Sequence, residues 1–121
     1  MKELKDFDEF IKKGSVKKQK PDEPRAKFLI KESSENYSFL LELLDKFKIE
    51  NNNANTFIKS CYDILMELIR AKMLIDGYNA SGFDAHKAEV AYLKILKFDE
   101  KDVEFLDQMR FFRNGMLYYG T

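Results

Sequence analysis

Cysteine, net charge and long apolar runs are scarce in this chain. Lys plus Arg equals Asp plus Glu at 21 each, so no whole-molecule field draws it toward nucleic acid or a membrane, and any anion binding must be local. The single cysteine, Cys61, cannot form an intrachain disulfide, and its apolar helical surroundings favour a reduced core thiol. No apolar run approaches the roughly 18 residues of a membrane-spanning helix, and the Lys-rich start lacks the apolar region of a signal peptide. We therefore expect a soluble, cytoplasmic protein without a membrane partner.

Several catalytic motifs and structural patterns are also missing from the sequence. There is no glycine-rich phosphate loop, no serine elbow, no period-two alternation of a β-hairpin and no internal repeat. The single histidine, His86, has no second His or Cys at ligand spacing. The sequence therefore predicts neither a metal site nor a cofactor.

Helical periodicity is what the sequence does contain. Its 121 residues fit one domain. Residues 1–23 are expected to form a short N-terminal helix, stopped by Gly14, and a basic linker whose lysines either attract phosphate or simply face solvent. Residues 24–121 are expected to form four main helices, over about 25–47, 55–76, 84–96 and 99–120, with a turn at 78–83. Short turns between them favour an all-α, up-and-down antiparallel bundle.

The expected helix over 55–76 is the most apolar in the chain. Two apolar stripes, displaced by about a quarter turn or more, run along it. One consists of Phe57, Ile58, Cys61, Ile64, Leu65 and Leu68, and the other of Tyr62, Met66, Ile69 and Met73. A helix with two apolar stripes must be covered from two sides, and in so short a chain the second cover can be another copy. We therefore predict a homodimer with this helix at or near the interface.

Two arginines, Arg110 and Arg113, lie in an apolar row of the last expected helix, which Asp99 would cap at its start and Gly120 at its end. A guanidinium inside such a row must be paired, bound to a ligand, or placed at a cleft. Candidate carboxylate partners across the bundle are Asp63 and Glu67, on the polar strip of the 55–76 helix. The alternative is that these two residues form only solvated intrahelical pairs.

Four features of the chain fit one known helical family. They are the Lys-Pro pair before the first long helix, the sequence Cys61-Tyr62-Asp63-Ile64-Leu65-Met66-Glu67, the Gly77-Tyr78 turn followed by His86, and the closing Arg113-Asn114. With these features the segment 17–121 resembles the HEPN family, named for higher eukaryotes, prokaryotes and nucleotide binding. The resemblance implies a dimeric bundle that is often encoded with a minimal nucleotidyltransferase, or that acts as a metal-independent ribonuclease toxin.

The resemblance also implies a site on the last helix. Active members carry an Arg, four to six further residues, and then a His. Arg113 and Asn114 match the start of this motif, but the histidine position holds Tyr118. A phenol with an ordinary pKa near 10 replaces an imidazole poorly when protons must be exchanged near neutrality. The candidate catalytic residues are Arg113, Asn114 and Tyr118, and the candidate residues for binding nucleic acid or a nucleotide are Arg110, Arg113, Glu67 and Asp63.

Three functions remain as alternatives. We expect an RNA- or nucleotide-associated component of a toxin–antitoxin-like system with a minimal nucleotidyltransferase, whose ribonuclease motif is degenerate. The second is an active metal-independent ribonuclease, in which Arg113 steadies the pentacoordinate phosphate while a 2′-hydroxyl attacks. The third is a helical interaction module whose arginines are purely structural. Because of Tyr118 we expect cleavage to be weak or absent.

Overall fold

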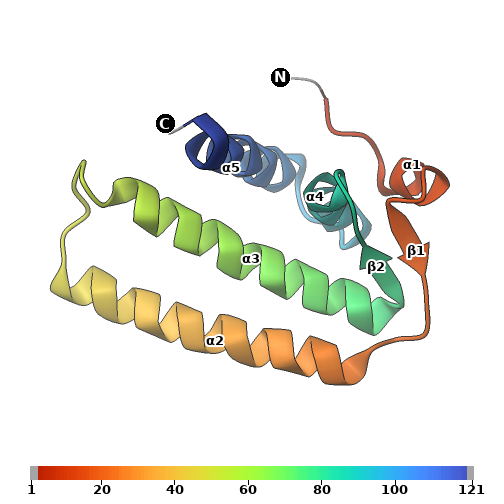
Figure 1. The fold of residues 1–121 in the computed structure, drawn as a ribbon, viewed down its shortest axis with the longest axis horizontal. Helices are drawn as coiled ribbons and strands as arrows, with labels where there is room; N and C mark the ends of the chain where they lie inside the picture. The colour runs from red at the N-terminus through yellow and green to blue at the C-terminus, as the bar shows by residue number, and fades with distance from the viewer. Residues whose placement is uncertain (1–2, 120–121) are drawn as a thin grey trace.

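Helices make up most of the chain (Figure 1). The computed structural model describes residues 3–119 and the side chains of residues 3–115. The elements are α1 (Phe7–Lys12), β1 (Val16–Lys18), α2 (Glu23–Lys46), α3 (Ala54–Asp76), β2 (Tyr78–Ala80), α4 (Ala85–Ile95) and α5 (Glu100–Tyr119). The prediction of an all-α bundle with four main helices and a short N-terminal one is confirmed. Gly120, expected as a C-cap, lies outside the described residues.

The ends of α2 and α3 follow from local chemistry. The side chain of Asp22 accepts a hydrogen bond from the Arg25 backbone N–H at 3.2 Å, and proline occupies the first turn of α2. At the same end of this helix pair, Gly77 closes α3 in the left-handed region, at φ 89°. A Cβ at residue 77 would also lie 2.8 Å from the backbone oxygen of Gln19. Residue 77 must therefore be glycine for two independent reasons.

The two strands correct two predictions, because residues 1–23 were expected to contain only a helix and a linker, and residues 78–83 only a turn. Instead β1 pairs antiparallel with β2, with Val16 opposite Ala80 and Lys18 opposite Tyr78. Strands of three residues are too short to show period-two alternation. Their partners are also far apart in sequence, so no hairpin turn marks them. The pairing fastens the N-terminal segment beside the end of α3 (Figure 1).

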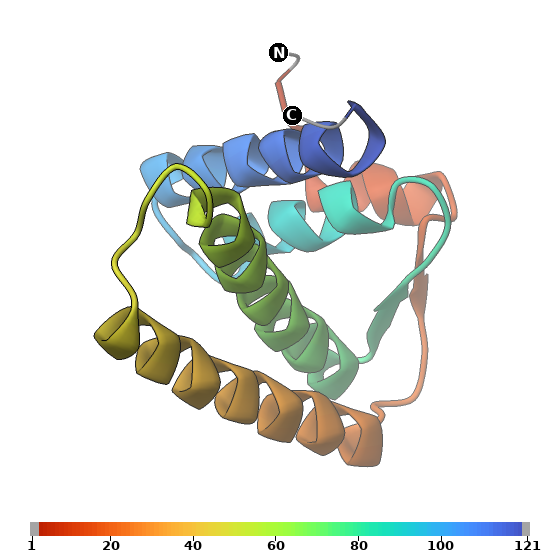
Figure 2. The ribbon, with the colours of Figure 1, turned by 60° about the vertical axis from the view of Figure 1, so that its left-hand side comes forward.

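The main core lies where α1, α3, α4 and α5 meet. Phe7 packs against Tyr92 and Tyr78, with ring centroids 4.8 and 5.2 Å apart, and all residues of α4 from Ala88 to Leu93 are buried. In contrast, α2 packs along α3 through two small clusters, around Leu74 and around Leu40. Figure 2 shows α2 on one side of α3, and α4 with α5 on the other. This makes α3 the central helix.

None of the helices within residues 3–119 combines the length and the apolar character needed to cross a bilayer. The same part of the chain holds no group of three or more His, Cys, Asp or Glu side chains that is suited to a metal ion.

Candidate functional site

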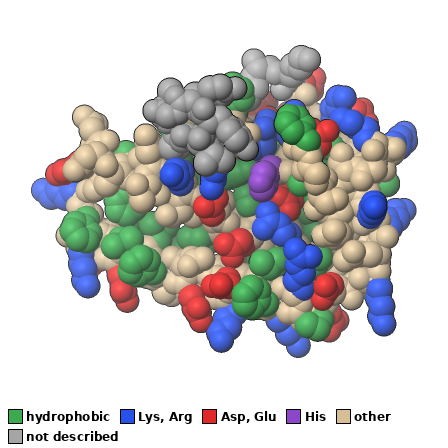
Figure 3. Space-filling model, in the orientation of Figure 1, with side chains coloured by type: hydrophobic (Ala, Val, Ile, Leu, Met, Phe, Trp, Pro, Cys, Tyr) green, Lys and Arg blue, Asp and Glu red, His purple; other side chains and the backbone are tan. Residues whose placement is uncertain are grey.

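One side of α3 carries charged side chains that face α4 and α5. Asp63 and Arg70 lie seven residues apart and therefore point in nearly the same direction. Residues of α4 and α5 lie beside them, and Tyr62 of α3 lies next to Asp63. We call the whole set the polar strip: Tyr62, Asp63, Arg70, His86, Glu89 and Arg113. The space-filling view shows the histidine at the surface among acidic and basic side chains (Figure 3).

Glu89 is the buried centre of the polar strip. Only 1% of this residue is exposed, and its carboxylate accepts hydrogen bonds from Arg70 Nε at 2.7 Å and Arg70 Nη2 at 3.1 Å. The bidentate pair keeps both charges in place, since a buried carboxylate needs its partners. The hydrogen bonding of Arg70 to the Glu89 carboxylate raises the pKa of Arg70 above its ordinary value. Arg70 and Glu89 are therefore a fixed ion pair between α3 and α4.

His86 is the third member of this cluster. Its Nδ1 lies 3.1 Å from Oε1 of Glu89. A carboxylate that accepts hydrogen bonds from Arg70 can also accept one from Nδ1 of His86, and in that tautomer Nε2 is the ring's acceptor. The side chain of His86 is 57% exposed, while that of Glu89 is 2% exposed. A buried carboxylate thus orients an imidazole that solvent can reach.

Tyr62 links this cluster to α5. Its ring lies edge-on to that of His86, with centroids 6.5 Å apart, and only 3% of Tyr62 is exposed. Burial raises the pKa of Tyr62 well above its usual range, an effect that the charge of Arg110 offsets only in part. Tyr62 is therefore a neutral phenol, and its neighbour in sequence, Asp63, makes the contact with Arg113.

Arg113 forms the expected contact across the bundle. Its Nε and Nη2 donate to the two carboxylate oxygens of Asp63 at 3.3 and 3.4 Å. The contacts are long, and the side chains of Arg113 and Asp63 are 25% and 51% exposed. Exposed pairs of this kind contribute about 0 to 1 kcal/mol. The Arg113 guanidinium is therefore held in position, but weakly enough to exchange its partner.

Arg110 differs from the prediction of a partner across the bundle. It is 8% exposed, and its Nε donates to Asp107 Oδ1 at 2.8 Å, one turn away on the same helix. Because Asp107 is also buried, the pair satisfies itself inside α5 and offers little charge to a ligand. Arg110 therefore pairs within its own helix rather than with Asp63 or Glu67 across the bundle, and its expected role in binding stays a prediction.

The other expected site residues are less informative. Glu67 lies 3.3 Å from the Ser33 hydroxyl, but that hydroxyl has a shorter contact, 2.8 Å, with the Leu29 carbonyl, so Glu67 makes no strong contact there. Asn114 is partly buried on α5. Tyr118 belongs to α5, but its side chain lies outside the described part of the structure.

The sequence reasoning missed the Arg70–Glu89–His86 cluster. The three-residue spacing from His86 to Glu89 was visible, since residues three apart on a helix are neighbours. What turns this pair into a site is the burial of Glu89 against Arg70, and that depends on how α4 crosses α3. No pattern within one helix reveals that contact.

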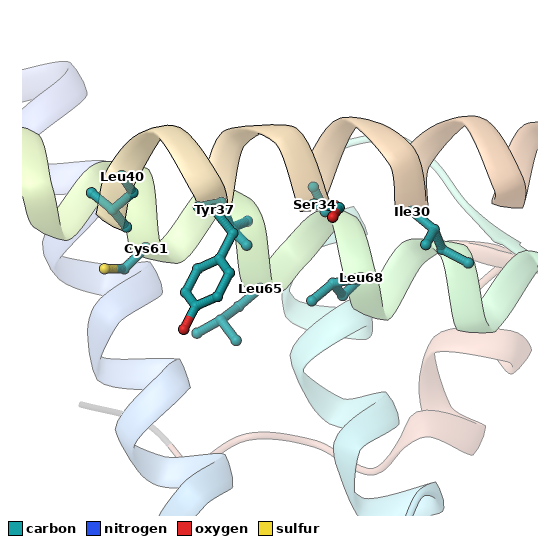
Figure 4. A pocket seen from close by; sticks show the side chains of 9 residues that line it. Ile30, Ser34, Tyr37, Leu40, Cys61, Leu65 and Leu68 are labelled. Atoms are coloured by element: carbon teal, nitrogen blue, oxygen red, sulfur yellow. The ribbon is translucent and has the colours of Figure 1, made fainter. Parts of the chain in front are cut away.

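The opposite side of α3 is apolar. Asp63 and Leu65 are two residues apart, about 200° around the helix, and so are Leu68 and Arg70. A cavity of about 380 Å³ lies between α2 and α3 (Figure 4), and another of about 470 Å³ lies between α3 and the α4–α5 pair. Leu65 and Leu68, each 42% exposed, line both. We call the joint surface the apolar groove; its main residues are Ile30, Tyr37, Leu65, Leu68, Phe98 and Phe105.

No protein-family model, curated protein or solved structure matches this chain. The two surfaces of α3 are the features of the described chain that bear on function. The polar strip joins an anion-binding group, Arg113, to an oriented imidazole, His86, by way of Tyr62. The apolar groove is a contiguous exposed apolar surface.

Proposed function

We propose that this chain is a HEPN-type helical protein that works as a homodimer and binds RNA or a nucleotide through the polar strip, within a toxin–antitoxin-like system that includes a minimal nucleotidyltransferase. The observation that carries the proposal is the state of Arg113. Of the three arginines around Tyr62, Arg70 and Arg110 bind buried carboxylates, whereas Arg113, among the side chains of residues 3–115, is held only by the half-exposed Asp63.

The geometry of Arg113 is suited to a phosphodiester. The guanidinium fork binds two oxygens of a phosphate as it binds the two oxygens of Asp63. The exposed carboxylate is a weak competitor, because the solvent already screens that pair. The chain has no net charge, so the attraction is local to the strip rather than a property of the whole surface.

The apolar groove supports the dimeric part of the proposal. Its floor, Leu65 and Leu68, belongs to the first apolar stripe of α3, whereas the second stripe is already buried against α4 and α5 of the same chain. Within the described chain, α2 covers only part of the first stripe, and large apolar side chains on both walls remain exposed: Ile30 at 43%, Tyr37 at 53%, Phe98 at 51% and Phe105 at 63%. A second copy presents the same surface to this one, as an isologous interface requires.

RNA binding is the direct test of the polar strip. Fluorescence anisotropy with a fluorescein-labelled single-stranded RNA at low salt should show saturable binding. Arg113→Met should weaken the affinity by about tenfold, and should lower the slope of affinity against salt by about 0.7 for each phosphate that is no longer neutralised. The control is Arg25→Met, which removes an exposed arginine from the first turn of α2. Equal affinities of the two variants would contradict the proposal and favour the structural interpretation of Arg113.

A substitution in the apolar groove tests whether the protein is a dimer that closes there. Size-exclusion chromatography with light scattering should give twice the mass of one chain for the wild type and for Phe83→Glu, which alters a fully exposed aromatic outside both cavities. Leu68→Glu should give the mass of a single chain, because a carboxylate would be buried at the interface. A dimer that survives Leu68→Glu would place the interface elsewhere.

The nucleotidyltransferase partner rests on the resemblance to the HEPN family alone. Coexpression with a small nucleotidyltransferase encoded beside this chain, followed by affinity purification through a tag on one partner, tests it. We expect both chains to be recovered together, and recovery of the tagged chain by itself would contradict this part of the proposal.

A further inference from the structure

We infer that the loop between β2 and α4 docks on an anionic lipid bilayer, with the ring of Phe83 inserted among the lipid chains and the lysines around it bound to the headgroups. The inference is independent of the proposed function, because it uses neither the polar strip nor the apolar groove. It also gives a role to the basic linker, for which the sequence left phosphate attraction and simple solvation as alternatives.

The exposure of Phe83 is the first step of the argument. This residue is 98% exposed, and Ser81 and Gly82 before it are exposed as well, so the ring stands at the tip of the loop. Removal of an aromatic ring from water is favourable roughly in proportion to the apolar area that is buried. At 98% exposure the single chain gains almost nothing from this ring.

Contacts on both sides of Phe83 hold the loop in this position. The backbone N–H of Ser81 donates to the carbonyl of Ser15 at 2.9 Å, and Nζ of Lys13 donates to the carboxylate of Asp84 at 2.9 Å. Figures 1 and 2 show the loop that leads from β2 into α4 lying beside α1. The ring is therefore presented outward by a loop that is tied to the N-terminal segment.

Positive charge surrounds the base of this tip. Nζ of Lys87 lies 4.0 Å from Asp84, in addition to the contact from Lys13. The hydrogen bond from Lys13 lowers the pKa of Asp84 against the effect of burial, and the charges of Lys13, Lys87 and Lys5 lower it further. Three lysines from three segments of the chain thus face one carboxylate beside Phe83, and positive charge is left over.

The basic linker extends this charge. Residues 12–20 contain five lysines and no acidic residue. The pairing of β1 with β2 fastens this segment to the strand that leads into the loop, and Lys17 and Lys18 of β1 are exposed. The chain as a whole has no net charge, so the attraction to an anionic surface is confined to this end of the molecule.

An anionic bilayer fits this surface because it offers both chemistries at once. Its headgroups attract clustered lysines, and its acyl region accepts an aromatic ring. A protruding ring would need a matching cavity on another protein but needs none on a bilayer, and a soluble polyanion would leave the ring in water. The contact is peripheral. It differs from the sequence-based expectation of a chain without a membrane partner, which rested on net charge and on the lack of a long apolar run.

Tryptophan fluorescence tests the insertion directly. The sequence contains no tryptophan, so Phe83→Trp places a single reporter at the tip of the loop. With vesicles of one part phosphatidylserine to two parts phosphatidylcholine, its emission should shift to shorter wavelength and be quenched by brominated acyl chains. Vesicles of phosphatidylcholine alone should cause neither change. A spectrum that the anionic vesicles leave unchanged would overturn the inference, even if heparin, a soluble polyanion, binds to the variant.

Cosedimentation with the anionic vesicles tests the contribution of the ring to affinity. Phe83→Ser should lower the affinity of the chain for these vesicles by about tenfold, because the apolar area that leaves water is lost. The matched control is Phe39→Ser, which removes a 60% exposed phenylalanine from α2 and should leave the affinity within about twofold. Equal affinities of the two variants would overturn the inference.

The same assay tests the lysines. Lys5→Gln combined with Lys87→Gln should lower the affinity by about fivefold for each lysine removed. Lys27→Gln combined with Lys31→Gln, which removes two exposed lysines from α2, is the matched control and should have a smaller effect. Equal losses in the two double variants would show that the charge beside Phe83 is not the docking surface, and would overturn the inference.

Discussion

The two open sides of α3 differ in almost every physical respect, although one helix provides both. On the polar strip, charges are paired with defined geometry, from the buried contact between Arg70 and Glu89 to the exposed contact between Arg113 and Asp63. On the apolar groove, leucines are half exposed between walls of aromatic and aliphatic side chains. Ionic pairs respond to pH, salt and charged ligands, whereas apolar surface responds to the presence of a covering chain. The two surfaces can therefore be tested independently.

The largest effect is expected from Glu89→Ala on the polar strip. The change leaves Arg70 half buried without its partner, and should cost about 3 to 5 kcal/mol of unfolding free energy. Urea denaturation followed by circular dichroism measures this. Glu104→Ala, an exposed change on α5, should stay within about 0.5 kcal/mol. Similar losses in both variants would remove the distinction between a buried and a solvated carboxylate.

A pair of leucines on α3 tests whether the apolar groove is core or surface in the single chain. Leu74 is fully buried beneath α2, so Leu74→Ala should cost about 2 to 5 kcal/mol. Leu68 is 42% exposed, so Leu68→Ala should lower the unfolding free energy by less than about 1 kcal/mol. This is measured at protein concentrations low enough for the protein to be monomeric. Equal costs would mean that the groove is already closed in the monomer.

Loss of stability in acid should distinguish variants that remove a polar contact from variants in the apolar groove. Burial acts to raise the pKa of Asp76, but hydrogen bonds from Tyr92 and Lys72 outweigh it and lower that pKa below its ordinary value of 3.8. Because the folded-state pKa is lowered, this stabilisation is present above about pH 4 and is lost as the pH falls through the lowered pKa. Tyr92→Phe should therefore lower the unfolding free energy by about 1 kcal/mol at neutral pH, and by less in acid.

Thermal unfolding at pH 7 and pH 3 measures that difference for Tyr92→Phe. The control is Leu68→Ala, because its cost depends on no titrating group and should be the same at both values. A cost of Tyr92→Phe that does not change with pH would show that the tyrosine acts only through packing.

The smallest effect on stability is expected from Asp63→Ala. The ion pair that this change removes is long and exposed, so unfolding free energy should change by less than about 0.5 kcal/mol. RNA affinity should rise several-fold, because Arg113 is released and a negative charge is removed from the polar strip. Asp45→Ala, an exposed change on α2, serves as the control and should leave affinity unchanged. Weaker binding by Asp63→Ala would mean that Asp63 positions Arg113 for the ligand.

Most of the helical framework was predictable because its signals are local. Asp22 caps α2 and Gly77 ends α3, and such ends are local because a cap needs only one residue and the backbone of the adjacent turn. The inward direction of Arg110 and Arg113 also followed from helical spacing. Their partners were predictable only in part. Asp63 was one of two candidate partners for either arginine and pairs with Arg113, whereas Arg110 binds Asp107 on its own helix.

The sequence by itself determined where the helices begin and end, and that α3 has more apolar surface than one neighbour can cover. Only the tertiary structure decided that β1 pairs with β2, and that α4 brings Glu89 under Arg70 and so orients His86. The reason is physical. Helix periodicity and capping are set by residues a few positions apart, whereas these contacts join segments far apart in the chain, and their geometry exists only once the helices have packed.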